Sequence, residues 1–399
     1  MKYILVLGDG MADEPLPECG GKTPLEAART PNTDELAVKS ELGMVHTIPD
    51  GMVPGSDTAN LSVLGYDPAR CYTGRSPIEA LSIGVDMKDT DAAYRCNIVT
   101  LTESAGSFEE QTIVDHSSGE ISTADSTVLL NAVRAELETD EFRFYAGTSY
   151  RHLLIWNHGR VIELAQPHDI LGKVIGPYLP EYLPFREMMK KSFDILRDHP
   201  INKARKERGQ NPANCIWFWG GGTKPLITSF EEKRHIRGVM ISAVDLLKGI
   251  GIGAGMKIIQ VEGANGGLNT NYRGKADAAL NAVLKDGYDF AYVHIEAPDE
   301  MGHLGNTANK IEAIERIDRD VIGPIRRTMQ ESGEPYRLLY LPDHPTPICL
   351  RTHTSDAVPY LLYDSTAEQD HSWHYSEREG RESGRYLEKG SMLMDRLFR

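Results

Sequence analysis

The amino-acid sequence predicts an α/β protein: a core with a mainly parallel sheet and helices on both sides of it, plus a smaller inserted α+β domain. Two observations lead to the core. Short apolar, β-branched runs that end in glycine or polar residues are typical of buried parallel strands, and amphipathic helices separate the later runs. A third observation leads to the insertion, because the middle of the chain has several strand patterns around one helix. Strands that alternate with helices favour a parallel sheet covered by helices.

The core elements follow from these patterns in chain order. Strands are expected at residues 2–8, 214–219, 257–261, 289–294 and 337–341. Amphipathic helices are expected at residues 235–249, 275–285 and 310–331. The last helix has one apolar face with spacings of three and four residues, formed by Ile311, Ile314, Ile317, Val321 and Ile325. Pro324 is expected to kink or break this helix near its end, because proline lacks the backbone N–H that a helix interior uses.

The predicted insertion covers residues 91–173, which leaves residues 1–90 and 174–399 for the core. Its strands are expected at residues 93–100, 142–145 and 152–156, around a helix at residues 123–137. The segment 365–381 is polar and charged, and it is expected to be an exposed loop before a closing helix.

Charge and cysteine content limit the function classes. The formal net charge of −15 argues against a general nucleic-acid or anionic-membrane surface. It does not exclude an anionic substrate, because a few arginines and bound cations can reverse the local field. The five cysteines lack CxxC spacing, which argues against a disulfide framework or zinc ribbon and fits a cytoplasmic location. The first apolar run ends at Gly8 and Asp9, too early for a signal peptide. The composition does not indicate an oligomeric state.

Metal-binding side chains follow three of the predicted strands. They are Asp9, Asp299, His303, Asp343, His344 and, a few residues further on, His353. Ligands of an open α/β sheet gather at the carboxyl ends of its strands, and one helical turn would point Asp299 and His303 at a common ion. Any one of these residues could equally be a helix cap or a loop polar group. Together they favour a metal site, for which Mn²⁺, Zn²⁺, Co²⁺ and Mg²⁺ all remain open.

Ser56 lies in the stretch VPGSDTANLSVLGYDP, directly before a helical pattern. A serine at a helix N-terminus beside a metal can lose its proton and act as a nucleophile, while backbone N–H groups hold a phosphate. An ordinary helix-capping serine is the alternative. The metal residues elsewhere favour the nucleophile.

Five motifs carry a resemblance to a known family. They are GDGM, PGSDTANLSVLGYDP, APDEMGH, PDHPTP and RTHTSDAVP. With TGRSPIEALSIGV, YRCNIVT and TNYRGKADAAL, they resemble the cofactor-independent phosphoglycerate mutases of the archaeal type, in the alkaline phosphatase superfamily, over nearly the whole chain. The resemblance implies an alkaline-phosphatase-like α/β/α core and a phosphoserine mechanism at Ser56. It implies a small phosphorylated substrate, two divalent metal ions, with Mn²⁺ favoured, and no nucleotide.

The resemblance also implies roles for individual residues. One metal would be held by Asp9, Ser56, Asp343 and His344, and the other by Asp299, His303 and His353. Substrate-binding residues are expected in the insertion, which would close over the metals: Arg95, Asn97, Asp115, His116, Arg151 and His152. In the core, Lys275 is similar to the family's lysine at the phosphate. Arginine suits a bidentate grip on carboxylate or phosphate and His116 could carry protons, although surface salt bridges are the alternative for each.

Other functions remain open from the sequence. Glu296 and Leu304 depart from the common mutase pattern, and PDHPTP with RTHT resembles a sister group proposed to act as homoserine kinases. In such a kinase Glu296 could contact a substrate ammonium group. A metal-dependent phosphatase is the third alternative, in which water resolves phospho-Ser56.

Four other features are interpreted as structural. The glycine-rich runs 249–255 and 219–224 lack the order or spacing of nucleotide-binding loops and are expected to be backbone turns. His371 and His374 are expected in a solvated loop. Trp217 and Trp219 are expected to pack in the core.

Overall fold

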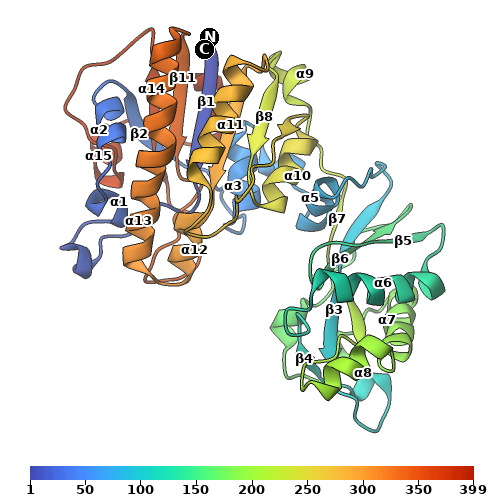
Figure 1. Ribbon diagram of the computed structural model, residues 1–399. Helices are drawn as coiled ribbons and strands as arrows, with labels where there is room; N and C mark the ends of the chain where they lie inside the picture. The colour runs from blue at the N-terminus through green and yellow to red at the C-terminus, as the bar shows by residue number, and fades with distance from the viewer. The chain divides into compact units, whose positions relative to one another are not determined.

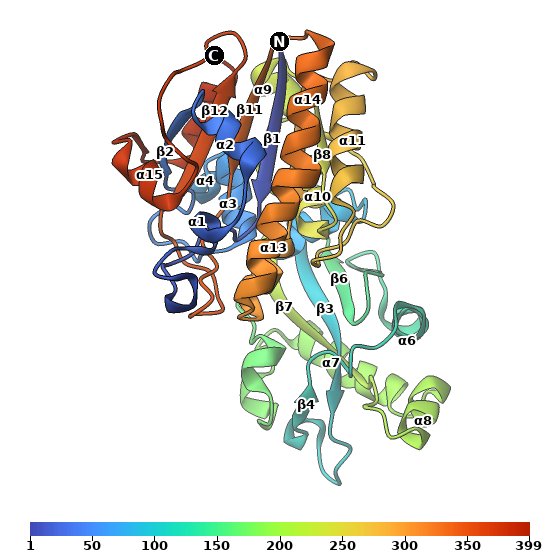
Figure 2. The same cartoon turned by 60° about the vertical axis from the view of Figure 1, so that its left-hand side comes forward.

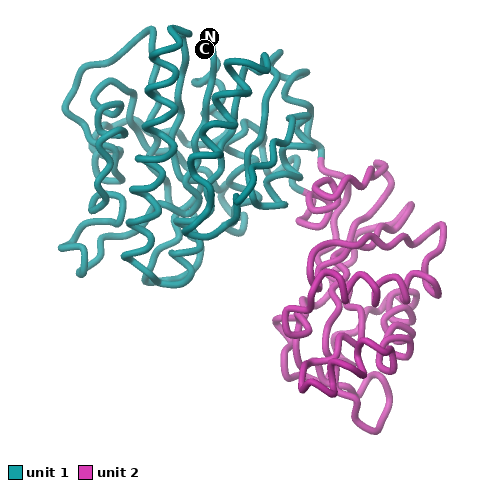
Figure 3. Tube along the Cα trace, in the orientation of Figure 1, with its two compact units in different colours: residues 1–72, 226–399 teal, residues 73–225 magenta.

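The computed structural model describes residues 1–399 and divides the chain into two units. Unit 1 consists of Met1–Tyr72 and Leu226–Arg399, and unit 2 consists of Thr73–Pro225 (Figure 3). Each unit has its own sheet and its own apolar core. No helix combines the length and the apolar composition that crossing a bilayer requires.

An eight-stranded sheet forms the centre of unit 1, in the order β13-β2-β12-β11-β1-β10-β8-β9. Its strands are β1 (Lys2–Gly8), β2 (Glu41–Val45), β8 (Gly238–Ile241), β9 (Lys257–Ile258), β10 (Phe290–Ile295), β11 (Tyr336–Leu341), β12 (Val358–Asp364) and β13 (Tyr386–Leu387). The central strand β1 pairs in parallel with β10 and β11, and only β12 runs antiparallel to its neighbours. The predicted mainly parallel sheet is therefore confirmed.

Helices cover both faces of this sheet, as predicted (Figures 1 and 2). One face packs against α11 (Tyr272–Leu284), α13 (Thr307–Ile317) and α14 (Gly323–Ser332), in a core that includes Ile4 and Val6 of β1. The opposite face carries α3 (Ser56–Val63) and α10 (Asp245–Gly253). Because neighbouring residues of a strand point to opposite faces, Tyr292 of β10 reaches α3 while Val293 joins the core under α11.

Shorter helices complete unit 1. They are α1 (Pro24–Ala27), α2 (Pro31–Ala37), α4 (Pro68–Cys71), α9 (Phe230–Arg234), α12 (Ala297–His303), α15 (Glu377–Glu382), α16 (Leu393–Leu397), η1 (Pro17–Cys19) and η6 (Gly390–Met392). The helix predicted at 235–249 is wrong, since this segment contains β8 and the start of α10. The four residues of β8 are all buried, and a short apolar run buried on all sides does not distinguish a strand from a helix by its period.

The predicted helix at 310–331 is instead three consecutive helical segments. A π-helical turn, η5 (Asp318–Ile322), joins α13 to α14, and the ribbon continues through it as one long rod (Figure 1). Pro324 lies in the first turn of α14. The predicted break at Pro324 does not occur, because α14 continues to Ser332, and the π-helical turn lies just before this proline. Such wide turns are one of the recognised ways in which a helix absorbs a local irregularity.

Unit 2 is built on an antiparallel sheet in the order β4-β3-β6-β5, with β7 also paired to β3. Its strands are β3 (Ala92–Leu101), β4 (Ile113–Asp115), β5 (Phe142–Tyr145), β6 (Arg151–Trp156) and β7 (Cys215–Thr223). Its helices are α5 (Arg75–Ser82), α6 (Thr123–Leu137), α7 (Leu183–Leu196), α8 (Pro200–Glu207), η2 (Phe108–Glu110), η3 (Pro167–Ile170) and η4 (Gly176–Tyr178). This is the α+β arrangement that the sequence predicts.

Unit 2 is longer at both ends than the predicted range 91–173. The strand expected at 214–219 in the core sheet is β7, which pairs antiparallel with β3 from Val99↔Cys215 to Ala92↔Thr223. Helix α7 packs Phe185 against Phe218 of β7, with ring centroids 4.9 Å apart. An apolar run indicates a strand but does not identify its partner, so only the folded chain assigns β7 to unit 2.

The remaining structural predictions have mixed outcomes. Residues 249–253 are the end of α10, and 219–223 are part of β7, so neither segment is wholly a turn. The tail from 365 has no regular secondary structure until α15 begins at Glu377.

Candidate functional site

The carboxyl ends of three adjacent strands bring the predicted metal residues of unit 1 together. Asp9 follows β1, Asp299 lies on α12 directly after β10, and Asp343 follows β11. These strands are parallel neighbours, so their ends open at the same edge of the sheet. His303 ends α12, four residues after Asp299.

The first group of ligand-type side chains contains Asp9, Asp343 and His344, whose ligand atoms all lie within 4.8 Å of one another. His344 Nε2 is 3.5 Å from both Asp9 Oδ1 and Asp343 Oδ2. Ser56 Oγ lies 3.2 Å from the same nitrogen. The four residues expected at one metal therefore converge on one point.

The second group contains Asp299, His303 and His353. The Nε2 atoms of His303 and His353 lie 3.2 Å and 3.4 Å from the two Asp299 oxygens, and 2.9 Å from each other. His344 also belongs here, since its ligand atoms come within 4.8 Å of those of Asp299 and His353. Two imidazole nitrogens that face each other across a carboxylate suit a shared cation. The two groups are thus adjacent.

The donor set fits divalent cations. Asp9 Oδ1 is buried and has no hydrogen-bond partner. Burial raises the pKa of Asp9 well above its usual range, and the nearby carboxylates of Asp343 and Asp299 raise it further. An isolated carboxylate in such surroundings is costly, and a divalent cation between the carboxylates would offset that cost. Asp9, Ser56, Asp343 and His344 would hold one ion, and Asp299, His303 and His353 the other.

Neighbouring groups already fix these side chains. Asp343 Oδ1 accepts hydrogen bonds from the backbone N–H groups of Gly10 and His344, at 3.1 Å and 2.9 Å. Asp343 Oδ2 accepts one from Asn60 Nδ2 at 2.8 Å. Asp9 Oδ2 lies 2.8 Å from His294 Nε2. Asp9 is held through Oδ2 alone, which leaves Oδ1 without a hydrogen bond, whereas both oxygens of Asp343 are held. Such support is expected of well-ordered metal ligands.

Ser56 is the first residue of α3 and not its cap. Gly55 occupies the cap position, and no side chain caps this helix end. The hydroxyl of Ser56 instead faces His344. Asn60, one helical turn later, donates to the Ser56 carbonyl at 2.8 Å and accepts a hydrogen bond from the buried Tyr292 hydroxyl at 2.5 Å. Asn60 therefore connects the serine with Asp343.

Sequence reasoning did not assign functions to His294, Asn60 or Tyr292. His294 is completely buried, its Nδ1 lies 3.1 Å from Ser242 Oγ, and burial lowers its pKa to about 3, so it is neutral. Its position at the end of β10 was a usable signal. The spacing of four between Ser56 and Asn60 was another.

Lys275 and Glu296 lie close to the metal residues. Lys275 is completely buried and donates to the His294 carbonyl oxygen at 2.9 Å, and burial lowers its pKa to about 8. Burial, with the charges of Glu300 and Asp299, raises the pKa of Glu296 to about 7. The charge of Lys275 acts in the opposite direction and lowers the pKa of Glu296. Glu296 is therefore not a solvated loop residue.

Unit 2 gathers four of its six predicted substrate residues on one face of its sheet. Asn97 of β3 pairs directly with Arg151 of β6, so both side chains lie on the same face as Arg95. The Arg95 guanidinium is held by Glu79 of α5 and stacks on Trp219 at 4.6 Å. His116 lies in the same region, where its backbone carbonyl accepts a hydrogen bond from the Asn97 side chain at 3.4 Å.

The other two predicted substrate residues do not join this face. Asp115 uses its carboxylate to accept hydrogen bonds from Ser117, Gly119 and Asn211, which order the loop that carries His116. His152 is buried on the opposite face of β6, and its Nδ1 accepts from the Gly147 N–H at 3.1 Å. Burial lowers the pKa of His152 to about 4. Both residues thus stabilise unit 2 internally.

The structure also places the two tryptophans that were expected in the core and the two histidines that were expected in a solvated loop. Trp217 is buried and donates to the Ala165 carbonyl at 2.8 Å, as expected for a core residue. Trp219 is partly buried and packs against the apolar core of unit 2, so the prediction of core packing is confirmed in part; its ring also contacts the Arg95 guanidinium. His371 and His374 contact the Ser40 carbonyl oxygen and the Asp34 carboxylate, respectively.

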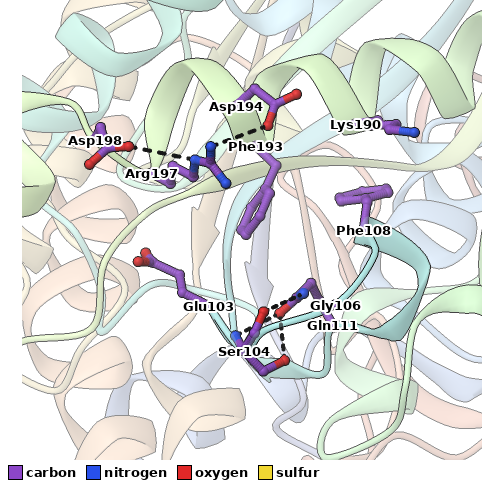
Figure 4. Close-up of a pocket in the computed structure, with 10 residues that line it drawn as sticks. All are labelled: Glu103, Ser104, Gly106, Phe108, Gln111, Lys190, Phe193, Asp194, Arg197 and Asp198. Atoms are coloured by element: carbon purple, nitrogen blue, oxygen red, sulfur yellow. Dashed lines mark hydrogen bonds and ion pairs between the residues drawn. The ribbon is translucent and has the colours of Figure 1, made fainter.

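A pocket of about 330 Å³ lies elsewhere in unit 2, beside α7 (Figure 4). Its charged groups are largely paired: Arg197 faces Asp194 and Asp198, and Glu103 pairs with Lys206. Gln111 is hydrogen-bonded to Ser104. The pocket holds none of the predicted site residues.

Comparison with known proteins adds to this geometry. The sequence profile of the 2,3-bisphosphoglycerate-independent phosphoglycerate mutases matches residues 37–202. The chain is 47% identical to a probable enzyme of that name from Geobacter sulfurreducens and 47% identical to one from Methanosarcina barkeri, in each case over 100% of both chains. The solved structure of a cofactor-independent phosphoglycerate mutase from Thermoplasma acidophilum matches with a TM-score of 0.69 and 28% identity, over 100% of this chain and 99% of that one.

Proposed function

The chain belongs to the family of 2,3-bisphosphoglycerate-independent phosphoglycerate mutases, and from this premise we propose that it interconverts 2-phosphoglycerate and 3-phosphoglycerate through a phosphorylated Ser56. The observation that carries the proposal is the convergence of Ser56 Oγ, His344 Nε2 and the Asp9 and Asp343 carboxylates on one point. Two divalent cations, of which Mn²⁺ is favoured, are proposed to bind there and at the adjacent group of Asp299, His303 and His353.

The proposed reaction has two phosphoryl transfers. The Ser56 hydroxyl loses its proton and attacks the phosphorus of the substrate, the bond from phosphorus to the glycerate oxygen breaks, and that oxygen takes up a proton. The neighbouring glycerate hydroxyl then loses its proton and attacks the phosphorus of phospho-Ser56, the bond from phosphorus to Ser56 Oγ breaks, and the serine takes up a proton. Cations bound at the two groups would supply positive charge that favours loss of the Ser56 proton and neutralises the transferring phosphoryl group.

The residues of unit 1 prepare this chemistry before substrate arrives. Hydrogen bonds from Asn60 and His294 hold Asp343 and Asp9 in place. Asn60 also fixes the backbone of Ser56, so the nucleophile and the carboxylate share one support. Preorganised charges of this kind need no rearrangement during the reaction, which is the main source of electrostatic catalysis.

In unit 2, we assign the binding of glycerate to Arg151 and His116. The Arg151 guanidinium is exposed, stacks on Tyr150 at 4.5 Å and has no carboxylate partner. An arginine without a partner can grip a carboxylate through two parallel hydrogen bonds. Retention of glycerate between the two transfers is what separates a mutase from a phosphatase, because an early loss leaves phospho-Ser56 to water.

One experiment distinguishes the three functions that the sequence leaves open. Purified protein with Mn²⁺ is given 3-phosphoglycerate and, separately, ATP with homoserine, and products are followed by phosphorus NMR. The proposal predicts 2-phosphoglycerate at equilibrium with little free phosphate and no need for ATP or bisphosphoglycerate. Phosphohomoserine without mutase product would indicate the kinase-like sister group, and free phosphate alone would indicate a phosphatase.

The same assay tests the metals. Treatment with a chelator should abolish turnover, and added Mn²⁺ should restore it. Full activity in chelator-treated protein that contains no divalent metal by elemental analysis would contradict the two-metal mechanism.

A further inference from the structure

We propose that His168 is a further substrate-binding residue of unit 2, which acts with His116 and Arg151 to hold the carboxylate group of glycerate. The inference rests on the proposed mutase function and deepens it. Nothing in the motif pattern singles out His168, and only the folded chain brings it to the face that carries Arg95 and Arg151.

An unbroken series of contacts places His168 among the predicted substrate residues. The Arg95 guanidinium stacks on the Trp219 ring at 4.6 Å, and His168 packs edge-to-face against the same ring at 5.3 Å. The His168 ring is in turn 6.1 Å from the His116 ring. On the other side of His116, the Tyr150 ring lies 5.8 Å away and supports Arg151.

Hydrogen bonds and buried neighbours fix the residues that form these contacts. Trp219 Nε1 donates to Asn97 Oδ1 at 3.1 Å, and the Asn97 amide donates to the His116 carbonyl oxygen. The turn that carries His168, η3, is anchored by Pro167 and Ile170, which are both buried. The backbone around the imidazole is therefore held, while its side chain is 43% exposed. A side chain with a fixed backbone and an exposed imidazole ring suits ligand binding better than core packing.

The charges on this face favour an anion. Arg151 and His116 have no carboxylate partner in the structure, whereas Arg95 is already bonded to Glu79 through two nitrogens. The carboxylate of Asp169, which is itself exposed, lies 3.8 Å from His168 Nε2. The His116 imidazole and the Arg151 guanidinium therefore offer N–H donors that no acidic side chain uses, and the His168 imidazole adds a further donor beside an exposed carboxylate.

The chemistry of the substrate identifies the anion. Phosphoglycerate has two anionic groups, and in the proposed mechanism the phosphoryl group is bound at Ser56 in unit 1. The carboxylate is then the group left for the cationic face of unit 2. Charge-assisted hydrogen bonds to a carboxylate are about twice as strong as neutral ones, so loss of one imidazole should weaken binding by about ten-fold.

The test compares one substitution at two histidines of the same unit. In His168→Asn the imidazole ring is removed. The matched control is His158→Asn, because His158 is also exposed but has a positive φ of 54°, which asparagine tolerates, and has no ring contact with this face. We expect kcat/KM for 3-phosphoglycerate to fall about ten-fold in His168→Asn and free phosphate to increase relative to 2-phosphoglycerate. In His158→Asn, kcat/KM and phosphorylation of Ser56 in a single turnover should be unchanged.

Inhibition by the two fragments of the substrate, D-glycerate and inorganic phosphate, identifies the group that His168 contacts. D-glycerate should inhibit His168→Asn about ten-fold less strongly than wild type, while inorganic phosphate should inhibit both equally. Unchanged inhibition by D-glycerate would overturn the proposal, and so would an equal loss of inhibition by phosphate.

The proposed mutase function is tested separately from the role of His168. Absence of phospho-Ser56 and of 2-phosphoglycerate in the wild type would contradict the mutase. Binding of D-glycerate to wild type and to His168→Asn, measured by calorimetry, would still decide the role of His168.

Discussion

The two units hold their functional side chains in opposite ways. In unit 1, Asp9, Asp343 and His344 are at most 2% exposed, and hydrogen bonds from neighbouring groups fix both carboxylates. In unit 2, Arg151 and His168 are exposed, and they are supported by the faces of aromatic rings. The first arrangement is buried and directional, and the second is open and adaptable.

This difference matches what each half of the proposed reaction requires. Phosphoryl transfer needs charges at fixed positions in a site of low dielectric constant, where electrostatic interactions are strong. Binding and release of a small acid need groups that remain accessible and can exchange water for ligand. We therefore expect substitutions in unit 1 to remove catalysis, and substitutions in unit 2 to change affinity and product partition.

The largest effect is expected for Ser56→Ala in unit 1. Mutase activity should fall by about 10⁴-fold or more, because alanine has no hydroxyl group to take up the phosphoryl group in the first transfer. The fold should survive, since a small residue at a helix start costs only about 1 kcal/mol. Circular dichroism and the thermal midpoint serve as folding controls. Mass spectrometry of substrate-treated wild type should find phosphate on Ser56, and phosphate on a different residue would show that the nucleophile is wrongly assigned.

A smaller loss is expected for Asn60→Leu, which removes a support but no ligand. Asp343 Oδ2 loses its hydrogen bond, so affinity for Mn²⁺ at this group should fall by about 10- to 100-fold. Calorimetric titration of Mn²⁺ measures it directly. The matched control is Asn281→Leu, an exposed position on α11 in the same unit. Equal Mn²⁺ affinities in the two variants would mean that Asp343 is positioned without Asn60.

The comparison predicts a different kind of defect for Arg151→Ala in unit 2. We expect kcat/KM for 3-phosphoglycerate to fall about ten-fold and the share of free phosphate to rise, because glycerate leaves before the second transfer. Mn²⁺ affinity should not change. Arg143→Ala is the control, since Arg143 is exposed on β5 of unit 2 and pairs with Asp140. A loss of Mn²⁺ affinity in Arg151→Ala would break the division between the units.

The smallest effect on turnover is expected for His152→Leu. His152 is buried, whereas His168 is exposed. The pKa of His152 is about 4 in the folded chain and about 6.5 in an unfolded one. As the pH falls from 7 to 4, the unfolded chain takes up a proton first, so wild type loses about 3 kcal/mol of stability from this residue. The stability difference between wild type and His152→Leu should shift by this amount in urea denaturation. KM at pH 7 should remain unchanged, and a raised KM would return His152 to the substrate-binding residues.

Much of the local structure could be predicted from the sequence. The strands Lys2–Gly8 and Phe142–Tyr145 and the helix Thr123–Leu137 have the predicted bounds, because period and capping are local properties that a single segment carries. The segment 235–249 was mispredicted because β8 is buried on all sides. In such a strand the apolar run has no polar face to reveal its period.

The candidate metal residues were also accessible from the sequence. They follow strands whose parallel arrangement is itself predictable, and a shared sheet edge then follows from topology. The roles of individual residues of unit 2 were less accessible. Alternation along β6 puts Arg151 and His152 on opposite faces, but only the pairing with Asn97 shows which face is open.

The sequence by itself determined the alternation of strands and helices, the strand-end positions of Asp9, Asp299 and Asp343, and the serine at the start of α3. Each of these depends on residues close together in the chain. Tertiary structure alone decided that β7 pairs with β3, that Asn60 reaches Asp343 across 283 positions, and that Trp219 joins His168 to Arg95. Such contacts depend on how whole elements pack, and no short segment carries that information.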